Sequence, residues 1–209
     1  MGSHPEGLLR GLDVCAGSGI GSFVFERIGL CQTVCYVEND PYCQRILQAR
    51  MRDGWISDAP LWSDLRNFDG KPWRGRADFI FGGIPCQPHS LAGKRLGESD
   101  ERNLWPDFLR VVREVGPRVV LLENVAGLLA AGPEGLSYMG AILGELSEAG
   151  YDAEWTTIGA VDVGAPHRRK RVWVVAYSAA GYAGSGSGVA EGAEPADGQP
   201  PLLLPDAGS

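Results

Sequence analysis

The sequence predicts an α/β fold, an open and mostly parallel twisted sheet with helices on both faces. Short apolar runs of strand length alternate along the chain with segments of helical periodicity. Several of these runs end in clusters of glycine or polar residues, and ligands bind such sheets beyond the carboxyl ends of the strands. Alternation of this kind favours parallel strands joined by helices.

The N-terminal part of the chain contains two strand–helix units. Leu8 to Val14 is a mostly apolar run that predicts a strand, and the helix-like segment Ser22 to Ile28 follows a Gly-rich turn. A second strand is expected from Gln32 to Val37. Pro41 stands where a first helical turn tolerates proline, and it opens a helix that runs to about Met51.

The rest of the chain continues the alternation. Four more strands are expected at Ala77 to Phe81, Arg118 to Leu122, Asp152 to Ile158 and Val172 to Tyr177, and two helices at Trp105 to Val115 and Leu136 to Ala149. A length of 209 residues favours one domain. We assign it to residues 1–177, because residues 178–209 are rich in Gly, Ala, Ser and Pro and predict a flexible tail.

Composition excludes several classes of protein. No apolar run approaches the roughly 18 residues that a membrane span needs, and no secretory signal is visible. The five cysteines are odd in number and lack Cys-x-x-Cys spacing, so we expect no metal site and a reducing cytosol. Cys31 and Cys35 lie in an apolar strand and are interpreted as buried small hydrophobes.

The net charge of −7 argues against a polyanionic partner, but positive charge is concentrated locally. Five basic residues stand together from His167 to Arg171, and smaller groups occur at Arg74 and Arg76 and at Lys94 and Arg95. The distribution leaves room for a local basic face.

The Gly-rich loop that follows the first strand predicts a nucleotide site only in combination with Glu38. Glycines allow close approach of a ligand to the backbone, and the amino terminus of the next helix favours a carboxylate or phosphate. Similar loops are also ordinary tight turns. Glu38 ends the second strand, where an acidic side chain commonly accepts hydrogen bonds from ribose hydroxyls. Together they indicate a cofactor that contains adenosine.

Cys86 is the candidate nucleophile. Most cysteines are buried structural thiols, and that interpretation stays open from the residue type alone. Here, however, Pro85 and Pro88 restrict the backbone on both sides, and Gly82 and Gly83 permit close approach of another molecule. A thiol with a pKa of about 8.5 still needs an activating neighbour, which the sequence does not identify.

Glu123 and Asn124 follow another apolar strand, so they are expected on the same rim of the sheet as Glu38 and Cys86. An isolated Glu there is more often a solvated strand end. Arg169 and Arg171, two residues apart before a late strand, project on one side if that strand begins early. Alone, they are more often surface charge.

These motifs taken together resemble the bacterial and phage DNA cytosine carbon-5 methyltransferases, in order from about Leu9 to Ala176. The matching segments are Asp13 to Gly19, Val37 to Asp40, Asp64-Leu65, Gly82 to Ser90, Glu123-Asn124-Val125 and His167 to Arg171. The chain departs from the common pattern at Cys15 and His89, where the family often has aromatic residues, and at Ile20, Ile84 and His167.

The resemblance implies a Rossmann-like S-adenosylmethionine-dependent methyltransferase fold, with residues 1–177 as the catalytic domain. It also implies the site residues. The cofactor would be bound by Asp13, Cys15, Ala16, Gly17, Ser18, Gly19, Ile20, Glu38, Asn39, Asp64, Leu65 and Pro85. The catalytic residues would be Cys86, Glu123, Arg169 and Arg171.

The implied substrate is double-stranded DNA in a bacterial or phage-infected cell, with the target cytosine flipped out of the duplex. Cys86 would add to carbon 6, while Glu123 binds the exocyclic amine and protonates ring nitrogen 3. Arg171 would hold the carbonyl oxygen and Arg169 would support the site or a phosphate. Residues 90–103 would form a loop that closes over DNA, with phosphate contacts from Lys94 and Arg95.

A complete family member also carries a target-recognition region and a last helix that returns to the cofactor pocket, and neither is recognisable here. Three alternatives follow: a minimal enzyme, the larger half of a split enzyme whose second subunit supplies target recognition, or an inactive chain. A cofactor- or DNA-binding module without catalysis is a different class of function. Transfer RNA is a further candidate substrate, because one branch of the family methylates it.

Overall fold

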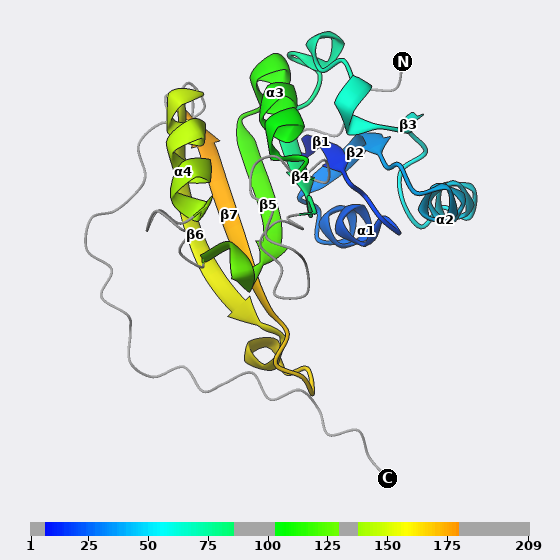
Figure 1. Ribbon diagram of the computed structural model, residues 1–209. Helices are drawn as coiled ribbons and strands as arrows, with labels where there is room; N and C mark the ends of the chain where they lie inside the picture. The colour runs from blue at the N-terminus through cyan, green and yellow to red at the C-terminus, as the bar shows by residue number, and fades with distance from the viewer. Residues whose placement is uncertain (1–6, 86–102, 130–137, 180–209) are drawn as a thin grey trace.

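A seven-stranded sheet organises the protein in the computed structural model, which describes residues 7–85, 103–129 and 138–179. The strand order is β3-β2-β1-β4-β5-β7-β6 (Figure 1). The strands are β1 (Leu9–Val14), β2 (Cys31–Val37), β3 (Leu61–Trp62), β4 (Phe79–Gly82), β5 (Val119–Val125), β6 (Tyr151–Gly159) and β7 (Lys170–Ser178). The helices are α1 (Ile20–Arg27), α2 (Pro41–Arg52), α3 (Trp105–Val115) and α4 (Tyr138–Glu148), with short 3-10 helices at η1 (Leu65–Asn67), η2 (Lys71–Trp73), η5 (Ala126–Leu129) and η6 (Ala160–Val163).

The prediction of a mostly parallel sheet is confirmed. Strands β3, β2, β1, β4 and β5 pair in parallel, as strands joined by helical crossovers do. Strand β7 pairs antiparallel with β5, and β6 pairs antiparallel with β7. The carboxyl ends of β1, β2, β4 and β5 therefore meet at one edge, which is where the candidate site residues were expected.

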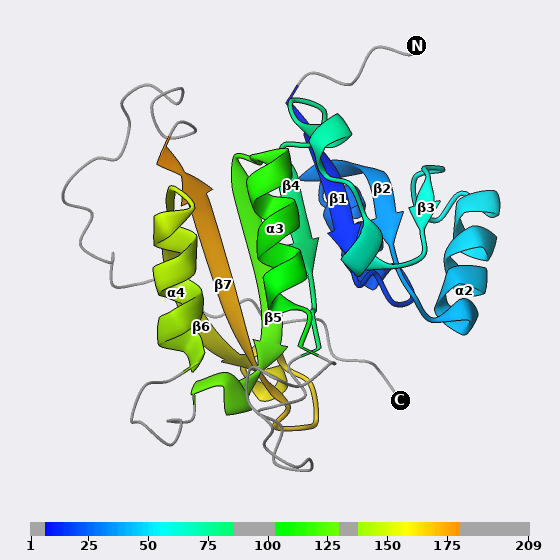
Figure 2. The ribbon, with the colours of Figure 1, turned by 45° about the horizontal axis from the view of Figure 1, so that its top comes forward.

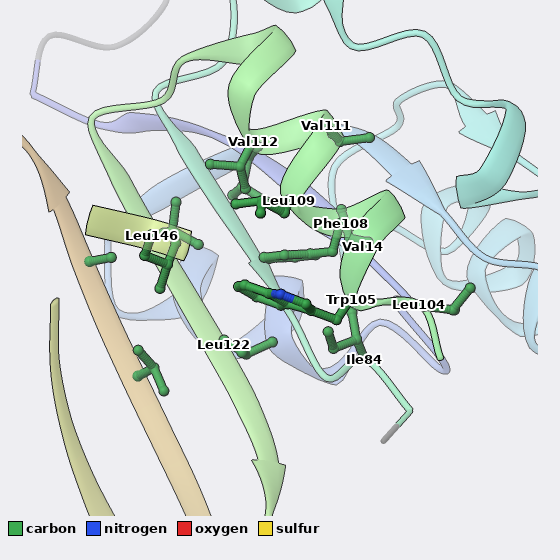
Figure 3. Close-up of a cluster of buried hydrophobic side chains, with 14 of the residues drawn as sticks. Val14, Ile84, Leu104, Trp105, Phe108, Leu109, Val111, Val112, Leu122 and Leu146 are labelled. Carbon is green, nitrogen blue, oxygen red and sulfur yellow. The ribbon is translucent and has the colours of Figure 1, made fainter. Parts of the chain in front are cut away.

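Helices cover both faces of the sheet, as predicted. Helices α3 and α4 lie on one face (Figure 2), where Trp105 and Phe108 of α3 pack into the main core against strands β1, β4, β5 and β7 (Figure 3). On the other face, Phe25 of α1 packs edge-on against Phe79 and Phe81 of β4. Burial of these aromatic side chains anchors the strands that carry the site.

Coverage of the second face is uneven. Along β5 buried and half-buried residues alternate, and Val120, Leu122 and Asn124 point to the buried side under α3 and α4. Leu121 on β5, with Trp173 and Val175 on β7, is only half-buried on the other side. The apolar face of β5 and β7 beyond α1 is thus partly open to solvent in the described part of the chain.

Helix α3 begins and ends at the predicted residues, Trp105 and Val115, because strong local signals mark both ends. Pro106 lies in its first turn, and Gly116 ends it in a left-handed conformation (φ 62°). The predicted ends of β4, β5 and β7 were wrong. Strand β4 runs from Phe79 to Gly82 and not from Ala77 to Phe81. Strand β5 continues through Glu123 and Asn124 to Val125, and β7 starts at Lys170, because these segments pair with each other up to Val125–Arg171.

Strand β7 also runs one residue past the predicted domain boundary, to Ser178. The predicted tail from residue 180 onward lies outside the described residues. No helix in the part of the chain that the structure describes is long and apolar enough to cross a membrane.

Candidate functional site

The loop between β1 and α1 depends on residues with left-handed backbone conformation. Gly17 (φ 55°) and Gly19 (φ 77°) adopt it, and so does Cys15 (φ 53°). A residue with a side chain rarely occupies this region, so its surroundings hold Cys15 there. The Gly19 position is also crowded, because a β-carbon would lie 2.7 Å from Cδ2 of Leu47. The two glycines therefore set the path of the loop.

Glu38, which directly follows β2, braces this loop. Its Oε2 accepts a hydrogen bond from the Gly17 N–H at 2.7 Å, and its Oε1 accepts one from the Asp40 N–H at 2.8 Å. The side chain is buried between loop and strand. Each carboxylate oxygen keeps a second lone pair, so the role of Glu38 as a ribose acceptor stays a prediction. The sequence did not indicate the link that Glu38 makes between β2 and the loop.

A pocket of about 370 Å³ opens beside this loop at the carboxyl ends of β1, β4 and β5. It is lined by Asp13, Cys15, Ala16, Gly17, Ser18, Ile20, Gly21, Phe25, Phe81, Gly82, Gly83, Leu121, Glu123 and Trp173. The volume falls within the roughly 300–1,000 Å³ of small-molecule sites. The fold thus brings the candidate cofactor loop and the candidate catalytic Glu123 together in one cavity.

Several predicted site residues lie elsewhere. Asn39 and Arg169 are exposed, and neither lines this pocket. Gly19, Glu38 and Arg171 do not line it either. Asp64 caps η1, where its Oδ1 accepts from the Arg66 N–H at 3.0 Å, and Leu65 is buried in the main core. Pro85 is half-buried at the end of the described segment. Cys86 and nearly all of the predicted closing loop, residues 90–102, lie outside the described residues.

Asp13 is the buried acid of the pocket. Its Oδ2 accepts from the hydroxyl of Ser22 on α1 at 2.6 Å, and the hydroxyl of Thr33 on β2 donates to Ser22 Oγ at 2.9 Å. This chain of hydrogen bonds joins β1, α1 and β2 underneath the loop. Burial, partly offset by the Ser22 hydrogen bond, raises the pKa of Asp13 to about 7, and the nearby Glu38 adds to the rise.

We predict that Asp13→Asn removes a pH dependence of stability. The folded state keeps a proton on Asp13 up to about pH 7, whereas the unfolded chain loses it near the ordinary pKa of 3.8. The unfolding free energy of the unsubstituted protein should therefore fall as pH rises, by about 3 kcal/mol more between pH 5 and pH 8 than that of the variant. Asparagine keeps an acceptor oxygen for Ser22 but cannot ionise.

Urea unfolding at pH 5 and pH 8 measures this difference, with Asp58→Asn, a change at an exposed residue, as the matched control. If the Asp13→Asn variant and the unsubstituted protein lose stability in parallel with rising pH, Asp13 is not the titrating group.

Glu123 and Arg171 form an ion pair across β5 and β7. Oε1 of Glu123 lies 2.6 Å from Nε of Arg171, and both side chains are partly exposed. In the strand register Arg171 stands opposite Val125, two residues beyond Glu123, so the pair is diagonal on one face of the sheet. The early start of β7 is what puts Arg171 on that face.

Glu123 and Asn124 lie close to Gly83 and Ile84, in the segment that leads to Cys86. A β-carbon at Gly83 would lie 2.9 Å from Oε2 of Glu123, so glycine is what lets the carboxylate lie over this segment. The buried Asn124 donates from Nδ2 to the Ile84 carbonyl at 3.3 Å, and its Oδ1 accepts from the Val125 N–H at 2.8 Å. Glu123 and Asn124 thus point to opposite sides of β5. Glu123 points into the pocket beside Gly83, and Asn124 points to the buried side, where it bonds Ile84.

Some residues around the site carry no motif in the sequence. Ser22 and Thr33 gave no motif signal, although small polar residues in otherwise apolar elements are candidates for buried hydrogen bonds. Arg50 was missed as well, and its Nη1 donates to the Ser18 carbonyl at 2.6 Å, which ties the loop to α2. The aromatic wall of the pocket, Phe25, Phe81 and Trp173, could be found only from the folded chain.

Solved structures with a similar fold include methyltransferases. A mutant form of DNMT2 from Spodoptera frugiperda superimposes with a TM-score of 0.64 at 20% identity, over 81% of this chain and 50% of that one. The Entamoeba histolytica methyltransferase EhMeth gives a TM-score of 0.63 at 19% identity, over 82% and 53%. At these identities the likeness concerns the fold alone.

Sequence relatives are Type II methyltransferases. M.NgoMIV of Neisseria gonorrhoeae is 36% identical over 165 residues, which is 79% of this chain and 50% of that protein. M.AplI of Arthrospira platensis is 37% identical over 169 residues, 81% of this chain and 46% of that protein. M.AquIA of Picosynechococcus sp. is 33% identical over 176 residues, 78% of this chain and 70% of that protein.

The chain therefore spans about half the length of most of these relatives. The model of the family of C-5 cytosine-specific DNA methylases matches residues 9–183, a stretch that contains the Gly-rich loop, Glu38, Cys86, Glu123 and Arg171. With this match over most of its length, the chain belongs to the C-5 cytosine-specific DNA methylase family.

Proposed function

We propose that this chain transfers a methyl group from S-adenosylmethionine to carbon 5 of a cytosine flipped out of duplex DNA, in the bacterial cytoplasm. The observation that supports the proposal is the shared pocket, which is lined both by the Gly-rich loop and by Glu123, the ion-pair partner of Arg171. The free state of all four described cysteines agrees with a reducing compartment.

The pocket suits the cofactor chemically. The first turn of α1 opens onto it through Ile20, and unpaired N–H groups at a helix start favour the carboxylate of the methionine part. Glu38 does not line this pocket but lies behind the loop, where its carboxylate keeps lone pairs for hydroxyl groups. The apolar walls of the pocket suit adenosine. Bound there, S-adenosylmethionine supplies an electrophilic methyl group.

The protein residues act on the cytosine. Cys86 thiolate adds to carbon 6, which raises the electron density at carbon 5. Glu123 hydrogen-bonds the exocyclic amine and protonates nitrogen 3, so that negative charge does not build up on the ring. Arg171, 2.6 Å from Glu123, holds that carboxylate in place and meets the ring carbonyl oxygen, while Arg169 supports the site from outside. Once carbon 5 has taken the methyl group, a base removes the proton from that carbon, the bond between Cys86 and carbon 6 breaks, and the ring is restored.

A second candidate is supported by the partly open apolar surface next to the pocket. Ile20, Val24 and Ile28 on α1 are 59%, 43% and 68% exposed, and the half-buried Leu121 and Trp173 continue this surface across the sheet. Apolar patches of this kind mark interfaces. We propose that a second subunit, which supplies target recognition, packs on this surface and closes the pocket.

One experiment tests both proposals. The chain is incubated with methyl-labelled S-adenosylmethionine and duplex DNA, and in parallel with duplex DNA that contains 5-fluorocytosine. We expect label in the first DNA and a covalent protein–DNA complex with the second, because fluorine cannot leave as the carbon-5 proton does.

Other outcomes separate the alternatives. Label in DNA without a trapped complex would contradict the covalent step. Cofactor binding without any transfer would favour dependence on a second subunit or a non-catalytic module. Label in transfer RNA but not in DNA would overturn the assigned substrate.

A further inference from the structure

The guanidinium of Arg110 on α3 spans the turn that contains η1. Its Nη2 donates to the carbonyls of Leu65 (2.8 Å) and Arg66 (3.3 Å), and its Nη1 donates to the carbonyl of Phe68 at 2.8 Å. A guanidinium presents its N–H donors in one rigid plane, so it can hold several carbonyls in a fixed arrangement. One side chain of α3 therefore fixes the backbone of this turn.

Two carboxylates of α3 orient this guanidinium. Oε2 of Glu114 lies 3.1 Å from Nη1 of Arg110, and Oδ1 of Asp107 lies 3.6 Å from its Nη2. The three residues are three and four positions apart, so they share one face of the helix. Oε2 of Glu114 also accepts a hydrogen bond from the Gly70 N–H at 2.8 Å. The segment from Leu65 to Gly70 is thus attached to a single face of α3.

The turn that Arg110 holds lies beside the cofactor loop. Strand β3 ends at Trp62, whose carbonyl accepts from the Glu38 N–H at 2.9 Å, and Asp64 follows two residues later. Cys15, which lines the pocket, packs against the core cluster that contains Leu65. Burial is the main cause that raises the pKa of Cys15 to about 12, and the charge of the nearby Asp64 adds to the rise.

Asp64 offers an acceptor at this position. Its Oδ1 accepts from the Arg66 N–H at 3.0 Å and lies 3.5 Å from Nη1 of Arg66, whereas none of the described residues bonds its Oδ2. The side chain is partly exposed, so a ligand can reach it. A carboxylate oxygen complements an amine donor such as the exocyclic amine of adenine. Because Asp64 directly precedes Leu65, its placement depends on the backbone that Arg110 holds.

We propose that Arg110 is a positioning residue for cofactor binding, which holds the Asp64–Leu65 turn so that Asp64 meets the exocyclic amine of the adenine ring. In this role Arg110 acts through backbone carbonyls and not by contact with the cofactor. The inference rests on the proposed function for the identity of the cofactor. Arg110 should therefore affect cofactor affinity and the preference for adenine, and leave the chemical step unchanged.

Binding of S-adenosylhomocysteine and S-inosylhomocysteine to the whole chain, measured by calorimetry, tests this role. The second ligand carries an oxygen in place of the amine, so the unsubstituted chain should bind it about 10-fold more weakly. For Arg110→Met we expect about 10-fold weaker binding of S-adenosylhomocysteine and almost no preference between the two ligands. For Arg110→Lys, whose ammonium lacks the planar fork, we expect a loss of about threefold and an intermediate preference.

The matched control is Arg113→Met, the same change at an exposed residue of α3, which should bind both ligands within about twofold of the unsubstituted chain. Three results would each overturn the proposal: unchanged affinity in Arg110→Met, an equal loss for both ligands that leaves the preference intact, or no binding by the unsubstituted chain. Thermal unfolding shows which variants are folded during the measurement. If Arg110→Met is not, Arg110→Lys decides, and a full preference for adenine in that variant would overturn the proposal.

Single-turnover methyl transfer to duplex DNA on the same samples keeps the two proposals apart. At saturating cofactor the Arg110 variants should react at the rate of the unsubstituted chain. Transfer in all samples with an unchanged preference for adenine would defeat the role of Arg110 alone. The expected change in preference without transfer in any sample would leave that role standing and defeat the enzymatic proposal.

Discussion

Cys86→Ser should abolish methyl transfer, by at least about 10³-fold, while cofactor affinity stays within about twofold. A cysteine thiol ionises near pH 8.5, so a modest stabilisation of its anion yields a nucleophile at neutral pH, whereas a serine hydroxyl needs a far stronger base. The change replaces one sulfur by oxygen, so neither the fold nor the Gly-rich loop should respond. The loss would therefore concern the chemical step.

The measurement is the rate of label incorporation into duplex DNA under single-turnover conditions, together with trapping on 5-fluorocytosine DNA. Cys43→Ser is the matched control, because Cys43 is a free and partly exposed thiol on α2, away from the pocket lining. Equal incorporation by the Cys86 variant and the unsubstituted chain would refute the assignment of the nucleophile.

Glu123→Gln should lower the rate of methyl transfer by about 10²–10⁴-fold, the range that general acid–base groups contribute. Glutamine keeps the size of the side chain and can still meet the exocyclic amine, but it cannot deliver a proton to nitrogen 3. The change also breaks the 2.6 Å ion pair with Arg171. Because both partners are partly exposed, that loss should cost less than about 1 kcal/mol of stability.

Single-turnover rates and thermal unfolding separate the two effects. Glu154→Gln, on the edge strand β6, removes an exposed carboxylate outside the pocket and should change neither. A Glu123 variant that transfers methyl groups at the normal rate, or one whose lower rate follows from unfolding, would contradict a role in protonating the base.

Local signals explain which elements could be predicted. The two ends of helix α3 could be predicted from a proline in its first turn and a glycine after its last turn, both of which are visible in the sequence. The end of β5 at Val125 and the start of β7 at Lys170 could be predicted only with knowledge of the partner strand, because pairing between β5 and β7 extends both. The two-residue strand β3 is too short for any period-2 pattern and exists because it pairs with β2.

The α/β fold class, the Gly-rich loop and the motifs of the candidate site could be predicted from the sequence, because periodicity, turn residues and motif spacing are properties of neighbours in the chain. The folded chain was needed to show that Glu123 pairs with Arg171, that Glu38 accepts a hydrogen bond from Gly17, and that the aromatic wall meets the loop in one pocket. Those contacts join residues distant in sequence, and their geometry depends on strand order and register. Neither quantity can be read from a single segment.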